Sequence, residues 1–376
     1  MRQNPWSWVN TTNVIWVEQP IGTGFTQGNA SAKTEEDVAQ QFLGFWKNFV
    51  DTFQMHGRKV YIAGESYAGM YIPYLADAML NEGNKEYFDL EATMMYDPVL
   101  NNNAVMRQVP VWAFTQYWQR LMGVNTTFMD EIRKRAENCG YVQYLDTHLQ
   151  YPPEGPLPAA PNGLGDEVVG ECDVWGAIID AVTLINPVRE PEASRESILT
   201  MHQCFDIYNI ATTCPLLWDV LGFPGTDQYL PTGAQVYFDR PEVKQAINAP
   251  NITWSEASPR AIYNTSSGLS ENWSKNRFTA LTVLPRVIER SKRTVIGHGG
   301  LDYILLLNGT LLSIQNMTWN GAQGFQNPIE DDFFVPYHTE YQMSTMAGAG
   351  IMGKTRTERG LTFFSIDISG HMGTYP

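Results

Sequence analysis

Short β-branched and aromatic runs alternate along the chain with longer stretches in which apolar residues recur every three or four positions. The short runs predict strands, and they cover residues 13–18, the segment from Lys59 onward, 90–96, 293–297 and 361–366. The longer stretches predict one helix behind the residues 34–37, with apolar positions from Val38 to Phe53, and another at 70–80 with Pro73 as a kink or restart. A further helix is predicted to start in the segment 237–247, with Pro241 in its first turn. No internal repeat is evident, and this alternation is typical of an α/β fold.

The first predicted helix has the clearest pattern. Thr34-Glu35-Glu36-Asp37 has the spacing of a capping box. Apolar residues then follow at helical spacing, namely Val38, Phe42, Phe45, Trp46, Phe49 and Phe53. We expect this aromatic stripe to face the core rather than a ligand.

The composition changes near residues 101–103. From there to about Gly233 the chain holds helix-like pieces, all four cysteines and a Pro/Gly-rich loop at 151–165. We interpret this stretch as a helical cap inserted into the sheet domain. The predicted organisation is a first core segment at 1–103, a cap insertion at 104–235 and a second core segment at 236–376.

Charge and polar composition narrow the class of protein. The net charge of -15 argues against a nucleic-acid partner, because no basic patch could neutralise phosphates. Charged residues make up only 17% of the chain, so other polar groups or sugar must solvate the surface. N-x-[ST] sequons exceed the two or three expected by chance, roughly, and lie at Asn10, Asn29, Asn125, Asn251, Asn264, Asn272, Asn308 and Asn316. They predict a glycoprotein of the secretory pathway.

The cysteines agree with an oxidising compartment. Cys139, Cys172, Cys204 and Cys214 allow three pairings, and the sequence does not choose among them. Their spacing does not fit a zinc site, so no metal is expected. The sequence also contains no apolar run long enough for a membrane span, and no signal peptide follows Met1. A glycosylated, bridged protein without a signal leads us to expect that the true N-terminus is missing.

The strand from Lys59 runs into Gly64-Glu65-Ser66-Tyr67-Ala68, and a helix-like stretch follows. This is the layout of a nucleophile elbow, a sharp strand-to-helix turn that raises a serine hydroxyl above a sheet. Small residues are needed on both sides of the serine because the turn crowds the backbone, and Gly64 and Ala68 meet that need.

A serine nucleophile requires a base to take its proton and an acid to orient that base. In α/β-hydrolase folds these groups occur in the order Ser, Asp or Glu, His, each after a core strand. Ser66, Asp302 and His371 satisfy this order. His298 is the competing base, but we place it on the same loop as Asp302, which is a poor position from which to approach the serine.

Several motifs resemble the serine carboxypeptidases, a family of α/β-hydrolase fold that acts in acidic compartments or outside the cell. The similar segments cover residues 4–8, 13–25, 64–69 and 370–372, and nearly the whole chain takes part in the match. Residues 204–206 and 299–303 resemble the fungal branch of the family. The resemblance implies a mixed, mostly parallel sheet with a helical cap.

The resemblance also implies roles for individual residues. Ser66 is similar to the nucleophile, Asp302 to the orienting acid and His371 to the base. The backbone N–H of Tyr67 is similar to one of two oxyanion-hole donors, and Glu65 to the acid that grips the C-terminal carboxylate of a peptide. A carboxyl group binds a carboxylate only if one of them keeps a proton, so we expect activity at mildly acidic pH that is lost as Glu65 ionises.

The chain departs from the family pattern at three places. An Asn-Gly-Gly-Pro-Gly segment that supplies the second oxyanion donor is expected upstream of Asn4 and is absent from this sequence. Residues 373–375 replace a Val-Pro pair, and Gly300 stands where many members have Asp. The absent segment leads us to expect an incomplete sheet and a rate lower by about a hundred- to thousandfold.

The preferred interpretation is a serine carboxypeptidase that cleaves peptide C-termini through an acyl-enzyme and needs no cofactor. We expect it outside the cell or in a vacuole. One alternative is an esterase or acyltransferase using the same triad, and another is a truncated, non-catalytic homologue. The side-chain preference, the disulfide pairing, the choice between monomer and homodimer, and the choice between secreted and vacuolar locations stay open.

Overall fold

A computed structural model describes residues 7–162, 168, 170–184, 205–212, 217–223, 230–258, 260–337 and 348–373. Its centre is a six-stranded sheet with the order β1-β2-β3-β8-β7-β6. The strands span β1 Lys59–Glu65, β2 Asp89–Tyr96, β3 Arg293–Gly299, β6 Asp331–Val335, β7 Gly350–Glu358 and β8 Leu361–Ile366. β1, β2, β3 and β8 are parallel, whereas β7 and β6 run antiparallel to their neighbours. A separate hairpin pairs β4 Thr318–Trp319 with β5 Ala322–Gln323.

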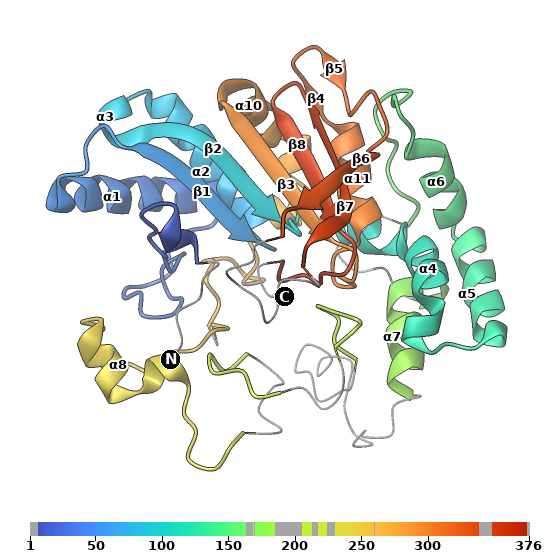
Figure 1. The fold of residues 1–376 in the computed structure, drawn as a ribbon, viewed down its shortest axis with the longest axis horizontal. Helices are drawn as coiled ribbons and strands as arrows, with labels where there is room; N and C mark the ends of the chain where they lie inside the picture. The colour runs from blue at the N-terminus through green and yellow to red at the C-terminus, as the bar shows by residue number, and fades with distance from the viewer. Residues whose placement is uncertain are drawn as a thin grey trace.

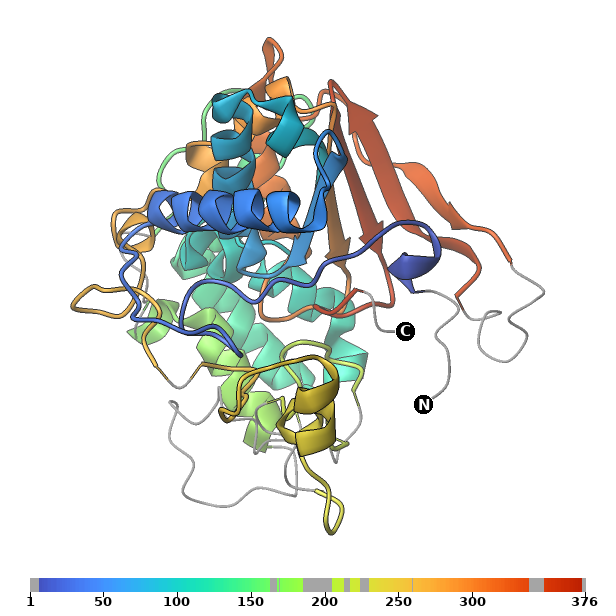
Figure 2. The same cartoon turned by 90° about the vertical axis from the view of Figure 1, so that its left-hand side faces the viewer.

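The helices span α1 Glu35–Phe53, α2 Ala68–Glu82, α3 Lys85–Phe88, α4 Val111–Met122, α5 Thr126–Asn138, α6 Tyr141–His148, α7 Val174–Leu184, α8 Pro241–Ala246, α9 Glu271–Ser274, α10 Leu284–Arg290 and α11 Leu307–Asn316. Helices α2, α10 and α11 contact the strands, and α1 packs on α2. The side view in Figure 2 shows α1 and α2 beside one face of the sheet. Figure 1 shows α4 to α7 as a group to one side of the strands. The α/β class with a mostly parallel mixed sheet is confirmed, while the domain boundaries stay a prediction.

Two apolar clusters hold these layers together. The first joins the sheet to its helices and is lined by Ile72, Met95, Leu284, Ile296 and Phe363, each at most 2% exposed. Burial of such side chains stabilises the fold by about 1.5–3 kcal/mol each.

The second cluster lies among α4, α5, α6 and α7 and includes Val111, Ile132 and Ile178. A disulfide between Cys139 and Cys172 crosses this cluster. The sequence left this pairing open, and Cys204 and Cys214 lie outside the described residues.

Helix α1 confirms its predicted start but not its predicted face. The Thr34 hydroxyl accepts from the Asp37 N–H, and the Asp37 carboxylate accepts from the Thr34 N–H, which completes the capping box. However, Phe53 is 62% exposed, and Phe45 is also exposed. The prediction that the whole aromatic stripe faces the core is therefore wrong. The buried face carries aliphatic residues such as Leu43, and Phe42 and Trp46 pack against this core while partly buried. The exposed rings of Phe45 and Phe53 instead contact the neighbouring ring of Phe49.

The predicted strand at 13–18 is also wrong. This segment pairs with no strand among the described residues, and Trp16 is 75% exposed. Glu18 fixes the end of the segment instead: its carboxylate accepts from the Phe25 N–H at 2.6 Å and from the Trp254 indole N–H at 2.5 Å. Helix α2 runs through Pro73 without a break, so no helix restarts there, and the predicted kink stays a prediction.

Candidate active site

The turn after β1 has the geometry of a nucleophile elbow. Ser66 has a φ of +59°, a region that non-glycine residues rarely adopt. Its N–H donates to the Tyr96 carbonyl at 3.0 Å, and its own carbonyl accepts from the Val99 N–H at 3.0 Å. A Cβ on Gly64 would come within 2.7 Å of the Ala68 side chain. The small residues on both sides of Ser66 are therefore required by the turn itself.

The register of the sheet brings four strand ends to one edge. Glu65 of β1 pairs with Tyr96 of β2, Tyr96 with Gly297 of β3, and Gly297 with Phe364 of β8. Because these strands are parallel, the segments that follow them leave from the same side of the sheet. Open α/β sheets bind ligands at this carboxyl edge.

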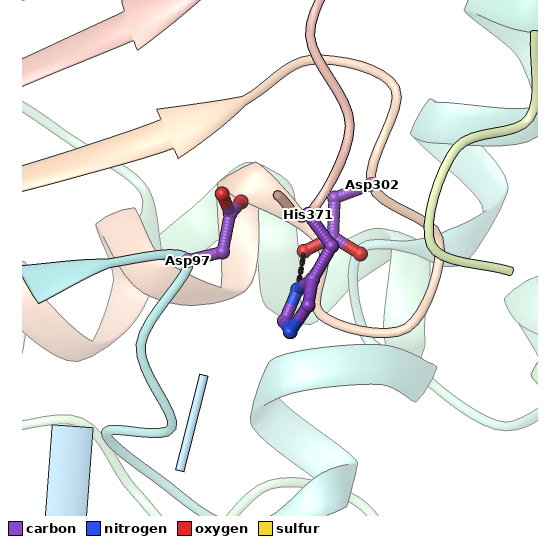
Figure 3. Close-up of side chains that lie close together, drawn as sticks. All are labelled: Asp97, Asp302 and His371. Atoms are coloured by element: carbon purple, nitrogen blue, oxygen red, sulfur yellow. Dashed lines mark hydrogen bonds and ion pairs between the residues drawn. The ribbon is translucent and has the colours of Figure 1, made fainter. Parts of the chain in front are cut away.

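Asp302, after β3, and His371, after β8, meet at this edge. The Asp302 Oδ2 and the His371 Nδ1 are 2.7 Å apart, and both side chains are buried (Figure 3). The second oxygen of Asp302 accepts from the N–H groups of Ile304 at 2.9 Å and Leu305 at 3.1 Å. The carboxylate is thereby fixed on both oxygens, and it holds the imidazole through Nδ1.

The other ring nitrogen of His371 is buried, and among the described residues it has no hydrogen-bond partner. The structure therefore contains no hydrogen bond from Ser66 to His371. Such bonds are often long without substrate and tighten when substrate binds. What the fold brings together is the acid and the base, on the same sheet edge as the serine.

The loops that carry Asp302 and His371 pack backbone against backbone. The Leu301 N–H donates to the Ser369 carbonyl at 2.8 Å, and the Gly300 N–H donates to the Ile366 carbonyl at 2.8 Å. A Cβ on Gly300 would lie 2.6 Å from the Asp367 carbonyl oxygen. Gly300, one of the departures from the family pattern, is therefore needed for the close approach of these loops.

His298 lies inside β3, so the prediction that it shares a loop with Asp302 is wrong. Its Nε2 is 3.0 Å from the Leu305 carbonyl oxygen and 3.1 Å from the Asp97 carboxylate. Burial lowers the pKa of His298 to about 4, so the ring is neutral near pH 7. The Nε2 of His298 therefore contacts Leu305 and Asp97 rather than Ser66.

Tyr67 and Glu65 flank the serine. Tyr67 stands at the N-terminus of α2, and its hydroxyl donates to the buried Glu35 carboxylate at 2.8 Å. Burial, with the nearby Glu35 charge, raises the pKa of Tyr67 far above its usual range. Glu65 is half-buried at the end of β1, and its charge adds to the raised pKa of Asp97, after burial and Asp302.

Asp97 is a site residue that the sequence reasoning missed. It follows β2 directly, and one donor atom from each of Asp97, Asp302 and His371 lies within 4.8 Å of the others (Figure 3). The only sequence signal was an acidic residue at the end of the strand beside the nucleophile strand. These donors are of types that bind divalent cations, but the Nδ1 of His371 is already used by Asp302.

The glycosylation candidates differ in exposure. The side chains at Asn10, Asn29, Asn125, Asn251 and Asn264 are exposed, and those at Asn308 and Asn316 are half-buried. Asn272 is fully buried, and its amide nitrogen donates to Glu36 at 2.6 Å. The folded chain cannot carry a glycan there, so Asn272 is withdrawn as a candidate. Within the described residues, no helix has the length and apolarity needed to cross a bilayer.

Comparisons with known proteins agree with this geometry. A family profile described as serine carboxypeptidase matches residues 1–376. A probable serine carboxypeptidase of Arthroderma benhamiae is 50% identical, over 98% of this chain and 67% of its own length. Serine-type carboxypeptidase F of Aspergillus niger is 40% identical, over 98% of this chain and 68% of its own. The chain thus spans about two thirds of these relatives.

A solved structure also shares the fold. The crystal structure of a prohormone-processing carboxypeptidase from Saccharomyces cerevisiae superposes with a TM-score of 0.67. The match covers 99% of this chain and 72% of the other at 21% sequence identity, so it speaks for the fold alone.

Proposed function

The chain belongs to the serine carboxypeptidase family and is a serine-type hydrolase, and we propose that its acyl-enzyme forms on Ser66 with His371 as the base. The observation that carries the proposal is the buried hydrogen bond between His371 and Asp302, on the sheet edge where the strained Ser66 ends β1. The named relatives are carboxypeptidases, which does not favour the esterase or acyltransferase alternative.

The proposed reaction begins at the last peptide bond of a substrate. The Ser66 Oγ attacks the carbonyl carbon while its proton passes to the Nε2 of His371. Asp302 keeps Nδ1 protonated and stabilises the imidazolium that forms. The Tyr67 N–H donates to the oxygen that becomes negative in the tetrahedral intermediate.

Collapse of the intermediate breaks the C–N bond. His371 returns its proton to the leaving amine, and the C-terminal amino acid departs. Water then attacks the acyl-Ser66 ester and gives a proton to His371. The bond between the Ser66 Oγ and the acyl carbon breaks, His371 returns the proton to Oγ, and the shortened peptide leaves with a free carboxylate. These steps use the side chains of Ser66, His371 and Asp302, the backbone N–H of Tyr67, and water.

Recognition of the free C-terminus is assigned to Glu65. A protonated Glu65 donates a hydrogen bond to the substrate carboxylate, and an ionised one repels it. Activity on peptides is therefore expected to fall as pH rises through the pKa of this pair. Proximity to Ser66 supports the role, since Glu65 precedes it directly in the chain.

The cellular setting is proposed from surface chemistry. The disulfide between Cys139 and Cys172 and the exposed sequons support a secreted or vacuolar protein. The substrates are peptide or protein C-termini.

The test is labelling with a fluorophosphonate serine probe at pH about 5, in the mildly acidic range where activity is expected. Wild type should label and Ser66→Ala should not, whereas Ser267→Ala, on an exposed loop, should label like wild type. Labelling that survives Ser66→Ala would refute the assignment. Hydrolysis of an N-blocked dipeptide should greatly exceed that of its C-terminal amide, and equal rates would refute the role of Glu65.

A further inference from the structure

Asp97 and Asp302 form a pair of buried carboxyl groups. Both residues are 0% exposed, and their oxygens approach within 4.8 Å of each other. Figure 3 shows Asp97 at the end of β2, beside the hydrogen-bonded Asp302 and His371. Two buried carboxylates this close cannot both ionise at low cost, because each raises the free energy of the charged form of the other.

The hydrogen bonds divide the two carboxyl groups into different roles. Asp302 accepts backbone donors on Oδ1 and the His371 N–H on Oδ2, as an ionised carboxylate does. Asp97 accepts from the Gly299 N–H on Oδ1 at 3.0 Å, and that oxygen also faces the His298 ring. Its Oδ2 is buried, and among the described residues it has no partner. A proton on Oδ2 of Asp97 would satisfy that atom by donation to Asp302.

The charged groups around the pair favour the same distribution. His298, whose Nε2 faces Asp97, is neutral because burial lowers its pKa to about 4. Burial and then the charge of Asp302 raise the pKa of Asp97 well above its usual range, and the charge of Glu65 adds to the rise. Among the described residues, the buried cation Arg107 interacts electrostatically with Asp302.

Two further titratable neighbours carry no positive charge. Tyr96 precedes Asp97, and its pKa is raised by burial and then by Asp97. The ring of Tyr208 lies tilted against the His371 ring with 5.3 Å between centroids, and burial and then Asp206 raise the pKa of Tyr208. Both phenols are therefore neutral across the working range, and neither offsets a second carboxylate.

We propose that Asp97 is a positioning residue that stays protonated and donates a hydrogen bond from Oδ2 to Asp302 throughout the reaction. The inference rests on the proposed function, in which His371 is the base. A hydrogen bond donated by Asp97 partly neutralises the charge of the Asp302 carboxylate, so Asp302 stabilises the His371 imidazolium less. His371 then keeps its basic form at a lower pH, which suits a triad that works in acid.

The rate of inactivation by a fluorophosphonate, measured against pH, reports this effect. The probe has no C-terminal carboxylate, so its rate follows the free-base form of His371 and not Glu65. The variants are Asp97→Asn, which keeps a donor without a charge, and Asp97→Ala, which removes the donor. Asp332→Asn, on exposed β6, is the matched control, and near-ultraviolet circular dichroism checks the fold.

In Asp97→Ala, the acid midpoint of the inactivation rate should shift in opposite directions for a protonated and an ionised Asp97. Asp97→Asn should leave the acid midpoint unchanged, whereas Asp97→Ala should raise it by about one pH unit, because Asp302 regains its full charge. If Asp97 were ionised, both variants would remove a negative charge and lower the midpoint, and that result would overturn the inference. An unchanged midpoint in Asp97→Ala would overturn it as well.

A second measurement does not depend on the alanine variant or on activity. The infrared difference spectrum between wild type and Asp97→Asn at pH about 7 should contain the C=O stretch of a protonated carboxyl group, because burial keeps the proton on Asp97. The Asp332→Asn difference should lack it. Absence of the band from the Asp97→Asn difference would overturn the inference even if the probe labels Ser66. A wild-type chain that never labels would instead overturn the proposed function, and with it the role assigned to Asp97.

Discussion

Removal of the Glu35 carboxylate should destabilise the fold and slow acylation of Ser66. Glu35 is 1% exposed and accepts hydrogen bonds from the hydroxyls of Tyr67 at 2.8 Å, Tyr263 at 3.1 Å and Ser270 at 2.5 Å. Glu35→Ala leaves these three hydroxyls without their acceptor inside the protein. Each buried donor left unpaired costs about 1–3 kcal/mol, so the sum is about 3–6 kcal/mol after partial re-pairing. That is a large share of a typical stability of about 5–15 kcal/mol.

The assay is urea unfolding followed by fluorescence, with the free energy of unfolding taken by linear extrapolation. Glu35→Gln keeps an acceptor oxygen and should lose less than Glu35→Ala. Glu82→Ala is the control, since it removes a surface carboxylate whose ion pair with Lys47 spans 3.6 Å and should cost at most about 1 kcal/mol. Below the transition, probe labelling of Glu35→Ala should be slower because Tyr67, the proposed oxyanion donor, loses its anchor. A loss under about 1 kcal/mol would show that Glu35 does not hold this cluster.

Two further predictions concern the loops and strands behind the triad. Burial lowers the pKa of His298 to about 4, so the unfolded chain takes up this proton at a higher pH than the folded chain does. The free energy of unfolding of the wild type should therefore fall by about 3 kcal/mol between pH 6.5 and 4. His298→Gln, followed by thermal melts at each pH, should lose less stability over the same range. The raised pKa of Asp97 acts in the opposite direction in both proteins, so a larger loss in the variant would refute the reasoning. Gly300→Ala places a Cβ 2.6 Å from the Asp367 carbonyl oxygen and should lower the free energy of unfolding by about 1–3 kcal/mol. Most of the probe labelling of Ser66 should be lost as well. The same change at Gly44 in α1, where a Cβ meets nothing within 4 Å, should stabilise by about 1 kcal/mol, and equal effects at the two positions would contradict the steric argument.

Local chemistry explains what the sequence predicted correctly. The capping box at Thr34, the strands β2 and β8, and the start of α8 at Pro241 each depend on residues within one turn or one strand. The elbow at Ser66 belongs to the same group, because the crowding that requires Gly64 and Ala68 arises within five residues. Such features can be predicted without knowledge of any neighbour.

Features that depend on a distant partner were harder to predict. The run at 13–18 has the composition of a strand, but a strand also needs a neighbour, and composition does not supply one. The strands β6 and β7 were missed because polar and glycine residues interrupt the apolar pattern. The pairing of β7 with β8, and of β6 with β7, fixes them instead. The aromatic residues of α1 follow helical spacing, which shows a helix but not which side of it meets the core.

The role proposed for Asp97 follows from register rather than from any motif. Tyr96 pairs with both Glu65 and Gly297, so the residue after it must emerge between the serine turn and the Asp302 loop. With the roles proposed for them, the proton on Glu65 matters at the upper end of the active pH range and the proton on Asp97 at the lower end. Loss of the proton on Glu65 ends substrate binding as pH rises, while the proton on Asp97 keeps His371 basic as pH falls. Adjacent strand ends would thereby set both limits of activity, and the fluorophosphonate, which bypasses Glu65, separates them.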